Sequence, residues 1–336
     1  MMKRWQFWLG VAISAVFLFF ALRGVDWAAT WQAVQTAQVG YLALAWVCLL
    51  ASYLSRAMRW RSVLLPLKLV SLWTSWRVFM VGLVSNNVLP ARAGELVRAY
   101  VLGQSERVDT AAVLGTVAVE RVFDVLTVLL LLSLGMTSGA LGGLGGEYGL
   151  WLGAAMVGGL AAGVLVIALW GDRLTGVAAR LVGRFSPAWG EKIAGLGEAF
   201  VQGVRAVGSV KRAAIVVGWT WISWGLFLLY AYWVLCAYHL TVNAAGVAFL
   251  MGFAGLAVAI PSAPGSVGTM EYAYMLGLAL LGVGMEETRI GFALTYHVLE
   301  WVTTLALGLF CLGQLGLSLR QVSAMANPAR RGADLP

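Results

Sequence analysis

The chain has 336 residues, of which 61% are hydrophobic and only 11% are charged. Soluble globular domains carry roughly 25% charged residues, so this composition excludes an ordinary soluble protein. The net charge of +8 is typical of cytoplasmic loops in a membrane protein and does not indicate nucleic-acid binding. Three scattered cysteines and two histidines give neither a disulfide framework nor metal-ligand spacing. We therefore expect an integral membrane protein with no metal, no cofactor and no nucleic-acid partner.

Apolar segments recur along the whole chain, at about 5–22, 40–55, 69–88, 110–134, 149–170, 213–236, 245–262, 267–283 and 290–316. The first of them follows two basic residues, as a signal peptide would. Its apolar run of about 18 residues is longer than the core of an ordinary signal peptide. We therefore interpret it as an uncleaved first span.

Basic residues set the expected topology, because cytoplasmic loops are enriched in Lys and Arg. The loop 135–148 contains neither residue, whereas the loop 171–212 contains seven of them. Arg56, Arg59, Arg61 and Lys68 would also lie in the cytoplasm. This assignment requires that 69–105 returns to the cytoplasmic side from which it came, and that 245–285 returns to the outside.

The predicted fold is an all-α polytopic membrane protein with about six full transmembrane helices and two re-entrant helical hairpins. The alternative is eight or nine ordinary spans with a weak charge bias. We expect one transmembrane domain over 1–316, with pseudo-repeats over about 40–134 and 213–316 and cytoplasmic interfacial helices over about 171–212. The remaining 317–336 would be a short cytoplasmic tail. Both termini would face the cytoplasm, in the inner (plasma) membrane.

Matched spacings in the two hairpins and in the spans that follow them indicate an inverted repeat. The strings PARAGELVRAY and PGSVGTMEYAY place proline, glycine and tyrosine at identical intervals, and each carries a glutamate after the glycine. GTVAVERVFD and GFALTYHVLE each place a basic residue three positions before an acid. A chance match is the alternative explanation. Inverted repeats with broken helices are typical of secondary transporters, whose half-helix N-termini face anionic groups.

Arg92, Glu95 and Arg98 are the first candidate site residues, because their spacing places them on one stripe of a helix. Unpaired charge at the bilayer centre costs roughly 2.5–3.5 kcal/mol, so a partner is expected. Our interpretation is a phosphate site in which Glu95 orients the two guanidiniums, since arginine binds phosphate bidentately. The alternative is an interfacial helix with solvated charges.

Further charged residues occur in the later spans. Glu120 and Asp124 share a helix face, and Arg121 can reach Asp124 as an internal ion pair, unless these groups bind protons or lipid. His297 with Glu300 is a similar pair, and Glu271 is either a helix-dipole partner or a site residue. Asn86 and Asn87 are expected to satisfy free backbone at the hairpin tip, and Asp26 to cap a helix or lie in a loop. The candidate substrate-binding set is Asn87, Arg92, Glu95, Arg98, Glu120, Arg121, Asp124, Glu271, His297 and Glu300.

The strings NNVLPARAGELVRAYVL, VERVFDVL and PSAPGSVGTMEYAY resemble the motifs of the lysylphosphatidylglycerol synthase transmembrane-region family, also called flippase-like domain proteins. The resemblance covers about 40–316. It implies movement of a lipid between leaflets, which in bifunctional members accompanies a separate soluble domain that aminoacylates the lipid. We expect the translocating half here without the synthase domain.

The predicted function is therefore a lipid flippase or scramblase, not an enzyme, for an anionic phospholipid or a polyprenyl-phosphate lipid. The sequence contains no ATPase motif, so proton or ion coupling, or the lipid gradient itself, would drive transport. The protein could also form a homo-oligomer. One alternative is a polyprenyl-dependent glycosyltransferase or lipid-modifying enzyme, which the single acid Asp26 in the loop 23–39 disfavours. Another is a membrane scaffold, which would not need buried charges in both halves.

The topology generates a labelling test. Single cysteines at positions 63 and 107 should be labelled from the same side of the membrane, and those at 107 and 140 from opposite sides, because 69–105 should not cross. If the labels at 63 and 107 reach opposite sides, both the re-entrant hairpin and the inverted repeat are wrong.

Overall fold

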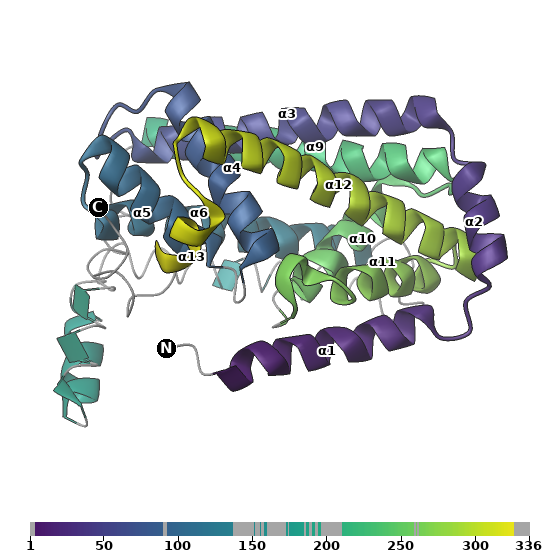
Figure 1. Ribbon diagram of the computed structural model, residues 1–336, viewed down its shortest axis with the longest axis horizontal. Coiled ribbons are helices and arrows are strands. Elements are labelled where there is room, and N and C mark those ends of the chain that lie inside the picture. Colours follow the sequence, from purple (N-terminus) through teal and green to yellow (C-terminus); the bar gives the residue numbers. More distant parts are fainter. Residues whose placement is uncertain are drawn as a thin grey trace.

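The computed structural model describes residues 4–89, 93–136, 210–258, 260 and 262–325, together with 175–184 and scattered positions between 151 and 195. Over these residues the chain forms helices and turns, with no strand (Figure 1). The predicted all-α class is therefore confirmed for these residues. The expected span 149–170 and most of the expected interfacial helices lie outside the described residues.

Four long helices form the frame of the structure: α3 (Val39–Leu64), α6 (Thr110–Met136), α9 (Val210–Ala237) and α12 (Glu286–Gln314). At 1.5 Å per residue each is about 39 Å long or longer, and a bilayer core is about 30 Å thick. In the part of the chain that is described, three helices, α3, α9 and α12, are also apolar enough to cross a membrane. A fourth span results if α1 and α2, which meet at 84°, are counted as one. α6 is as long but carries three charged residues in its middle.

Two pairs of shorter helices connect the long ones. The first pair is α4 (Leu72–Val88) and α5 (Gly94–Glu106), and the second is α10 (Ala244–Ala257) and α11 (Thr269–Leu280), joined through a 3-10 turn, η3 (Pro264–Ser266). The helices of each pair pack against each other. With 12 to 17 residues, they are about 18–26 Å long, which is less than the hydrocarbon thickness of a bilayer.

Each short pair begins and ends at the same end of the bundle. Lys68, which precedes α4, forms a 2.7 Å ion pair with Glu106, the last residue of α5. In the second pair, Gly246 in the first turn of α10 lies against Leu281, which follows α11. Each pair is therefore a helical hairpin, called here the first hairpin (α4–α5) and the second hairpin (α10–α11).

The two hairpins follow opposite ends of the bundle. α3 and α9 pack side by side along their length, and they are antiparallel because the Gln38 N–H before α3 donates to the Ala237 carbonyl at the end of α9 (3.0 Å). The first hairpin follows the C-terminal end of α3, and the second follows the C-terminal end of α9. In Figure 1 α4 and α5 accordingly lie toward one end of the molecule, with α11 toward the other.

Small residues allow the hairpins to pack closely against the long helices. α4 packs on α12 and α10 packs on α6. A Cβ at Gly308 of α12 would overlap Val84 of α4, and one at Gly135 of α6 would overlap the Phe249 backbone of α10. Membrane helices associate through such small-residue contacts, because lipid gives no hydrophobic drive between apolar surfaces.

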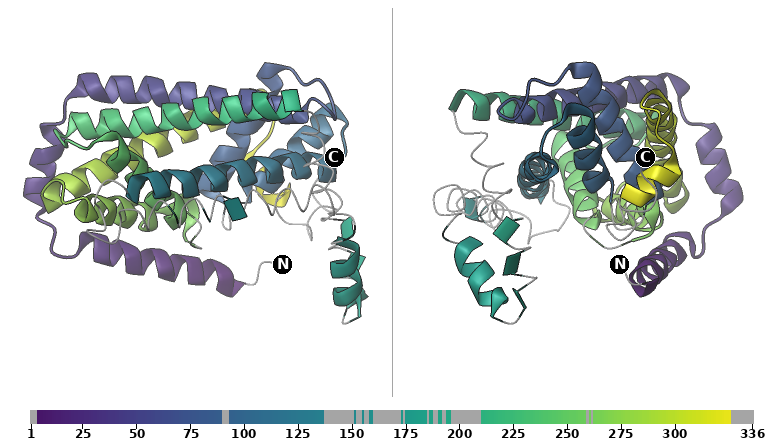
Figure 2. Two further views of the ribbon diagram at one scale, coloured as in Figure 1. Left: turned by 180° about the vertical axis from the view of Figure 1, so that it is seen from behind. Right: turned by 60° about the vertical axis from the view of Figure 1, so that its left-hand side comes forward.

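The N-terminal helices α1 (Arg4–Leu22) and α2 (Trp27–Gln35) wrap around the second hairpin and α12. α1 lies along the outside of the bundle (Figure 2), where the Ser14 hydroxyl accepts a 2.7 Å hydrogen bond from the Ala263 N–H. The Asp26 carboxylate accepts from the Ala28 and Ala29 amides, so its predicted role as a helix cap is confirmed. A final short helix, α13 (Leu319–Met325), packs on α5.

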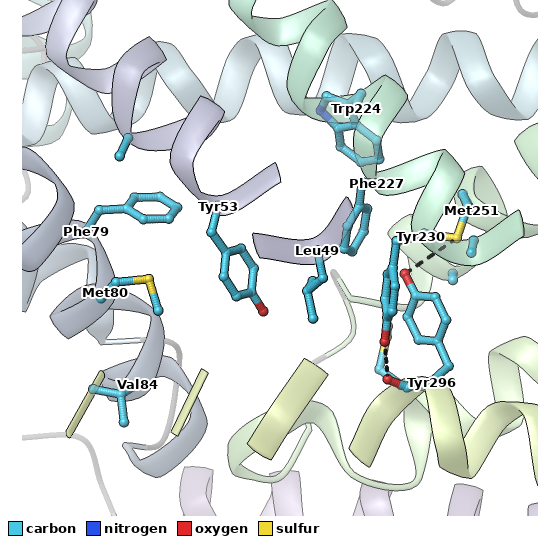
Figure 3. Close-up of a cluster of buried hydrophobic side chains, with 14 of the residues drawn as sticks. Leu49, Tyr53, Phe79, Met80, Val84, Trp224, Phe227, Tyr230, Met251 and Tyr296 are labelled. Carbon is cyan, nitrogen blue, oxygen red and sulfur yellow. Dashed lines mark hydrogen bonds between the residues drawn. The ribbon is translucent and has the colours of Figure 1, made fainter. Parts of the chain in front are cut away.

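A buried core rich in aromatic side chains joins α3, α4, α9, α10 and α12 (Figure 3). Tyr230 and Tyr296 lie with ring centroids 4.3 Å apart, and the Tyr230 hydroxyl donates to the Tyr296 carbonyl at 2.6 Å. Tyr53 shares a 2.7 Å hydrogen bond with Thr304. These hydrogen bonds satisfy the buried hydroxyls, as buried polar groups require.

The close α6–α10 crossing predicts a specific sensitivity to added side-chain volume. In the Gly252→Ala variant the new Cβ would lie 2.6 Å from the Leu132 amide nitrogen, so we expect a loss of about 1–3 kcal/mol through overpacking. The measurement is thermal unfolding in detergent. Gly225→Ala on α9, where a Cβ meets nothing within 4 Å, is the control and should be neutral or slightly stabilising. Equal effects would contradict the close crossing.

Candidate functional site

Charged side chains gather where each hairpin meets the long helix that follows it. The first-hairpin network consists of Arg59, Glu95, Arg98, Glu120, Arg121 and Asp124. The second-hairpin pair consists of Glu271 and His297. Both contain the second helix of the hairpin, α5 or α11, and the next long helix, α6 or α12.

Glu120 is the centre of the first-hairpin network. Its side chain is fully buried (0% exposed), yet it carries a carboxylate. One oxygen accepts from Arg59 Nε of α3 at 3.3 Å, and the other accepts from Arg98 of α5. A buried carboxylate requires such partners because its desolvation would otherwise be prohibitive. Glu120 therefore ties α3 and α5 to α6.

Asp124, one turn further along α6, extends the network to α9. Arg59 binds it with two parallel hydrogen bonds, 2.7 Å from Nη1 to Oδ1 and 3.2 Å from Nη2 to Oδ2. Trp224 of α9 donates its indole N–H to the same carboxylate at 3.2 Å. Arg121 contacts Asp124 at 3.1 Å, so the predicted Arg121–Asp124 pair is confirmed. The bidentate geometry of Arg59 is the strongest form of this contact.

Arg98 lies between Glu120 and two aromatic rings. Its guanidinium carbon is 3.8 Å from the centroid of Trp60 and 5.3 Å from that of Phe79. The Trp60 indole is fixed by a 3.1 Å hydrogen bond to Thr116. Only 4% of the Arg98 side chain is exposed, so ion pairing and cation–π contact together cover the charge.

The exposed edge of the network is the pair Arg121–Glu95. Their 3.3 Å contact joins α6 to α5, and the two side chains are 46% and 34% exposed. The network thus runs from a dry centre at Glu120 to an accessible edge. Its three arginines and three acids have a formal charge sum of zero, which lowers the cost of placing them within a membrane protein.

This arrangement differs from the sequence interpretation in two respects. Glu95 was expected to orient Arg92 and Arg98, but it pairs with Arg121, and Arg98 pairs with Glu120. Arg98 therefore has its own neutralising partner, because the fold brings α6 against α5. Arg92 lies outside the described residues. The roles of Arg92 and Arg98 in substrate binding stay predictions.

Sequence reasoning missed Arg59 as a site residue. It was expected in a cytoplasmic loop, but it lies within α3 and is 1% exposed. Its position at the basic end of an apolar run resembles a loop boundary, which explains the error. One signal could have found it: α6 carries the two acids Glu120 and Asp124 but only one base, so another helix had to supply a cation.

The tip of the second hairpin lies against the end of α4 in the first hairpin. Asn86 accepts a 2.9 Å hydrogen bond from the Gly94 N–H, which confirms its predicted role in satisfying free backbone. The carbonyl of Asn87 lies beside Gly265 of the second hairpin, and α4 packs against η3. A side chain at Gly265 would collide with Trp301. The contact with Trp301 and the positive φ of 72° therefore both favour glycine there.

The second-hairpin pair was expected to join His297 to Glu300, but the partner is Glu271. His297 Nδ1 lies 2.6 Å from Glu271 Oε1, and Nε2 lies 2.9 Å from the Gly265 carbonyl. Both ring nitrogens face acceptors, which suits an imidazolium with two N–H donors. The other Glu271 oxygen accepts from the Gly268 N–H at 2.7 Å. Glu271 thus caps α11, which confirms its predicted place at the helix N-terminus, and also holds the histidine. That it is a substrate-site residue stays a prediction.

Glu300 lies on α12 and is half-buried. It lies close enough to interact electrostatically with Tyr53 of α3, Tyr230 of α9 and Tyr274 of α11. It therefore faces the aromatic core and not His297 alone. The matched spacing of GTVAVERVFD and GFALTYHVLE further predicts that Asp124 and Glu300 lie near each other around a symmetry axis.

The lysylphosphatidylglycerol synthase TM region family matches residues 7–308 of this chain. The chain belongs to this family. It is also similar to Glycosyltransferase AglD of Haloferax volcanii, with 30% identity over 314 residues that cover 83% of this chain and 49% of the relative. The chain thus spans about half the length of that curated relative. Together, family and apolar helices establish a multi-pass membrane protein, as the motifs predicted.

The shared contacts of Glu120 predict that it is the most sensitive residue of the network. Glu120→Gln should lower the free energy of unfolding by about 3–5 kcal/mol, because two buried guanidiniums lose a charged partner. Glu106→Gln, which breaks the exposed pair with Lys68, should cost less than about 1 kcal/mol. Thermal unfolding in detergent measures both. Equal losses would show that the Glu120 contacts contribute little.

Proposed function

We propose that this protein moves a lipid with an anionic headgroup between the leaflets of a bilayer. The observation that carries the proposal is the placement of two short hairpins at opposite ends of the bundle, with their tips in contact and charged groups beside each. We further propose an inner (plasma) membrane location with cytoplasmic termini.

The order and packing of the helices support an inverted repeat with re-entrant hairpins. Each half contains a long helix, two short ones and a long one: α3, α4, α5 and α6, then α9, α10, α11 and α12. The contacts follow the same scheme, because α3 packs on its counterpart α9, while α4 packs on α12 and α10 on α6. Such repeats, with binding sites at broken helices, are a transporter architecture.

The first-hairpin network supports an anionic headgroup as the substrate feature. Arg121 is its accessible guanidinium, and its partner Glu95 is also part-exposed. A lipid phosphate can compete with Glu95 for Arg121, since arginine binds phosphate oxygens with a planar fork. Because Glu95 lies on α5 and Arg121 on α6, this exchange would remove one ionic contact between the hairpin and α6, while the buried Arg98–Glu120 contact keeps the two helices joined. Headgroup binding would then be linked to a local change at the edge of the hairpin.

The energy source for transport follows from the absence of an ATPase motif in the sequence. We propose movement along the lipid gradient, or coupling to protons through the Glu271–His297 contact, since histidine ordinarily titrates near neutral pH. In this proposal the protein is not itself an enzyme.

Lipid translocation in reconstituted vesicles tests the proposal. Arg121→Ala, Arg98→Ala and Arg92→Ala should each reduce transport of an anionic lipid, because a charge-assisted phosphate contact contributes about 1.5–3 kcal/mol, or roughly ten- to 150-fold in affinity. Arginine-to-lysine changes at positions 92 and 121 should retain part of the rate, since charge survives without the bidentate fork.

The controls separate transport from folding. Arg98→Ala also leaves Glu120 with one partner fewer, so its unfolding temperature must be measured beside its rate. Arg320→Ala, an exposed arginine on α13, should leave both unchanged. Wild-type rates in all three alanine variants of the site, with intact folding, would contradict the phosphate role.

A second candidate function is a membrane-embedded glycosyltransferase, which the name of the Haloferax volcanii relative favours. Such an enzyme would use an acid in the loop 23–39, where Asp26 is the single candidate. Asp26 accepts hydrogen bonds from two backbone amides and caps α2, which disfavours a catalytic role. Sugar transfer from a polyprenyl-phosphate sugar by the purified chain would favour this candidate over transport.

A further inference from the structure

An apolar groove lies on the bundle between α3, α4 and α12, away from the charged network. Its volume is about 740 Å³, and its walls are formed by Val47, Leu50, Ala51, Leu54, Leu72, Trp73, Trp76 and Leu307. This volume falls within the range of small-molecule sites, about 300–1,000 Å³. Each of these walls is a hydrocarbon or indole surface.

The groove faces the surroundings of the bundle. α3 and α12 are two of the candidate membrane spans, and the wall residues Val47 and Trp73 are 58% and 49% exposed. At this position a membrane protein contacts lipid, so hydrocarbon is the material available to fill the groove. An acyl chain matches its chemistry, whereas water would find few hydrogen-bond partners on these walls.

Arg77 lies next to this groove, one helical turn after Trp73 on α4. Its guanidinium carbon is 5.7 Å from the Trp73 ring centroid, and it lies near Cys311, one turn after Leu307 on α12. The side chain is half-buried. The Arg77 guanidinium therefore lies close to Trp73, a wall residue on α4, and close to α12.

Arg77 differs from the arginines of the first-hairpin network in having no acid. Arg59, Arg98 and Arg121 each contact at least one carboxylate. Among the described residues no ion pair contains Arg77, and its buried Nε, like those of Arg56 and Arg98, has no hydrogen-bond partner. An arginine in an apolar setting is costly without an anion. Arg77 can therefore pair with an anion from outside the chain.

We propose that the groove holds an acyl chain of an anionic phospholipid whose phosphate is bound by Arg77. The phosphate oxygens would satisfy the Nε and the terminal nitrogens of the guanidinium together. The chain would lie between the tryptophans of α4 and the apolar face of α3. This site is separate from the first-hairpin network, so it does not depend on the proposed transport function.

Native mass spectrometry of the detergent-purified protein tests the site. The probes are phosphatidylglycerol, diacylglycerol with the same chains, and inorganic phosphate. Phosphatidylglycerol should bind best, diacylglycerol weakly and phosphate not measurably, because both parts of the lipid contribute. Arg77→Gln should weaken phosphatidylglycerol binding by about ten- to 150-fold and leave diacylglycerol binding unchanged.

Groove-filling variants test the chain contact. Leu50→Trp should abolish binding of both lipids, and Ala51→Leu is the milder variant if Leu50→Trp does not fold. Arg320→Gln and Val302→Trp, which alter exposed positions on α13 and α12, are the matched controls and should bind like wild type.

If the Arg77 and groove variants all bind lipid like the controls, the binding is non-specific and the proposal is wrong. Binding of phosphate alone would overturn the chain contact. Since no step requires translocation, these results are independent of the transport assay.

Discussion

The rest of the structure depends on the ion pairs that the Glu120 carboxylate forms with two arginines. The carboxylate is completely buried and is shared by Arg59 from α3 and Arg98 from α5. A carboxylate in such a place is stable only when charged donors surround it. The three helices that supply these groups are therefore fixed relative to one another. Asp124 adds α9 through Trp224, so one helix turn of α6 organises four helices.

The cost of an unpaired buried charge also explains why the side chains of the network are buried at its centre and exposed at its edge. The central groups cannot exchange partners without leaving a buried charge, which gives them a structural role. The edge pair Arg121–Glu95 can exchange its partner for an external anion at lower cost, because both side chains reach the surface. A site that must hold its shape and still admit a ligand needs both kinds of contact. The proposed lipid headgroup would act at this edge.

Close backbone packing complements these ionic contacts. Glycines at the α6–α10 and α4–α12 crossings let each hairpin lie against a long helix of the opposite half. Where the tips meet, Gly265 approaches Asn87 and Trp301 closely. The second hairpin has its own, simpler ionic anchor in Glu271 and His297. Each hairpin thus combines packing of its first helix on a long helix with an ionic contact from its second helix, using different side chains.

The sequence by itself determined the membrane class, the long and short helices, the family and most charged candidates, because hydropathy and spacing are local properties. It also predicted the helix cap at Asp26 and the role of Asn86 in satisfying free backbone, both of which involve residues close in the chain. Only the tertiary structure decided which charges pair. Arg59 lies 61 positions from Glu120, and Glu271 lies 26 from His297. An ion pair depends on distances of about 3 Å between groups on different helices, and these distances arise only when the helices pack.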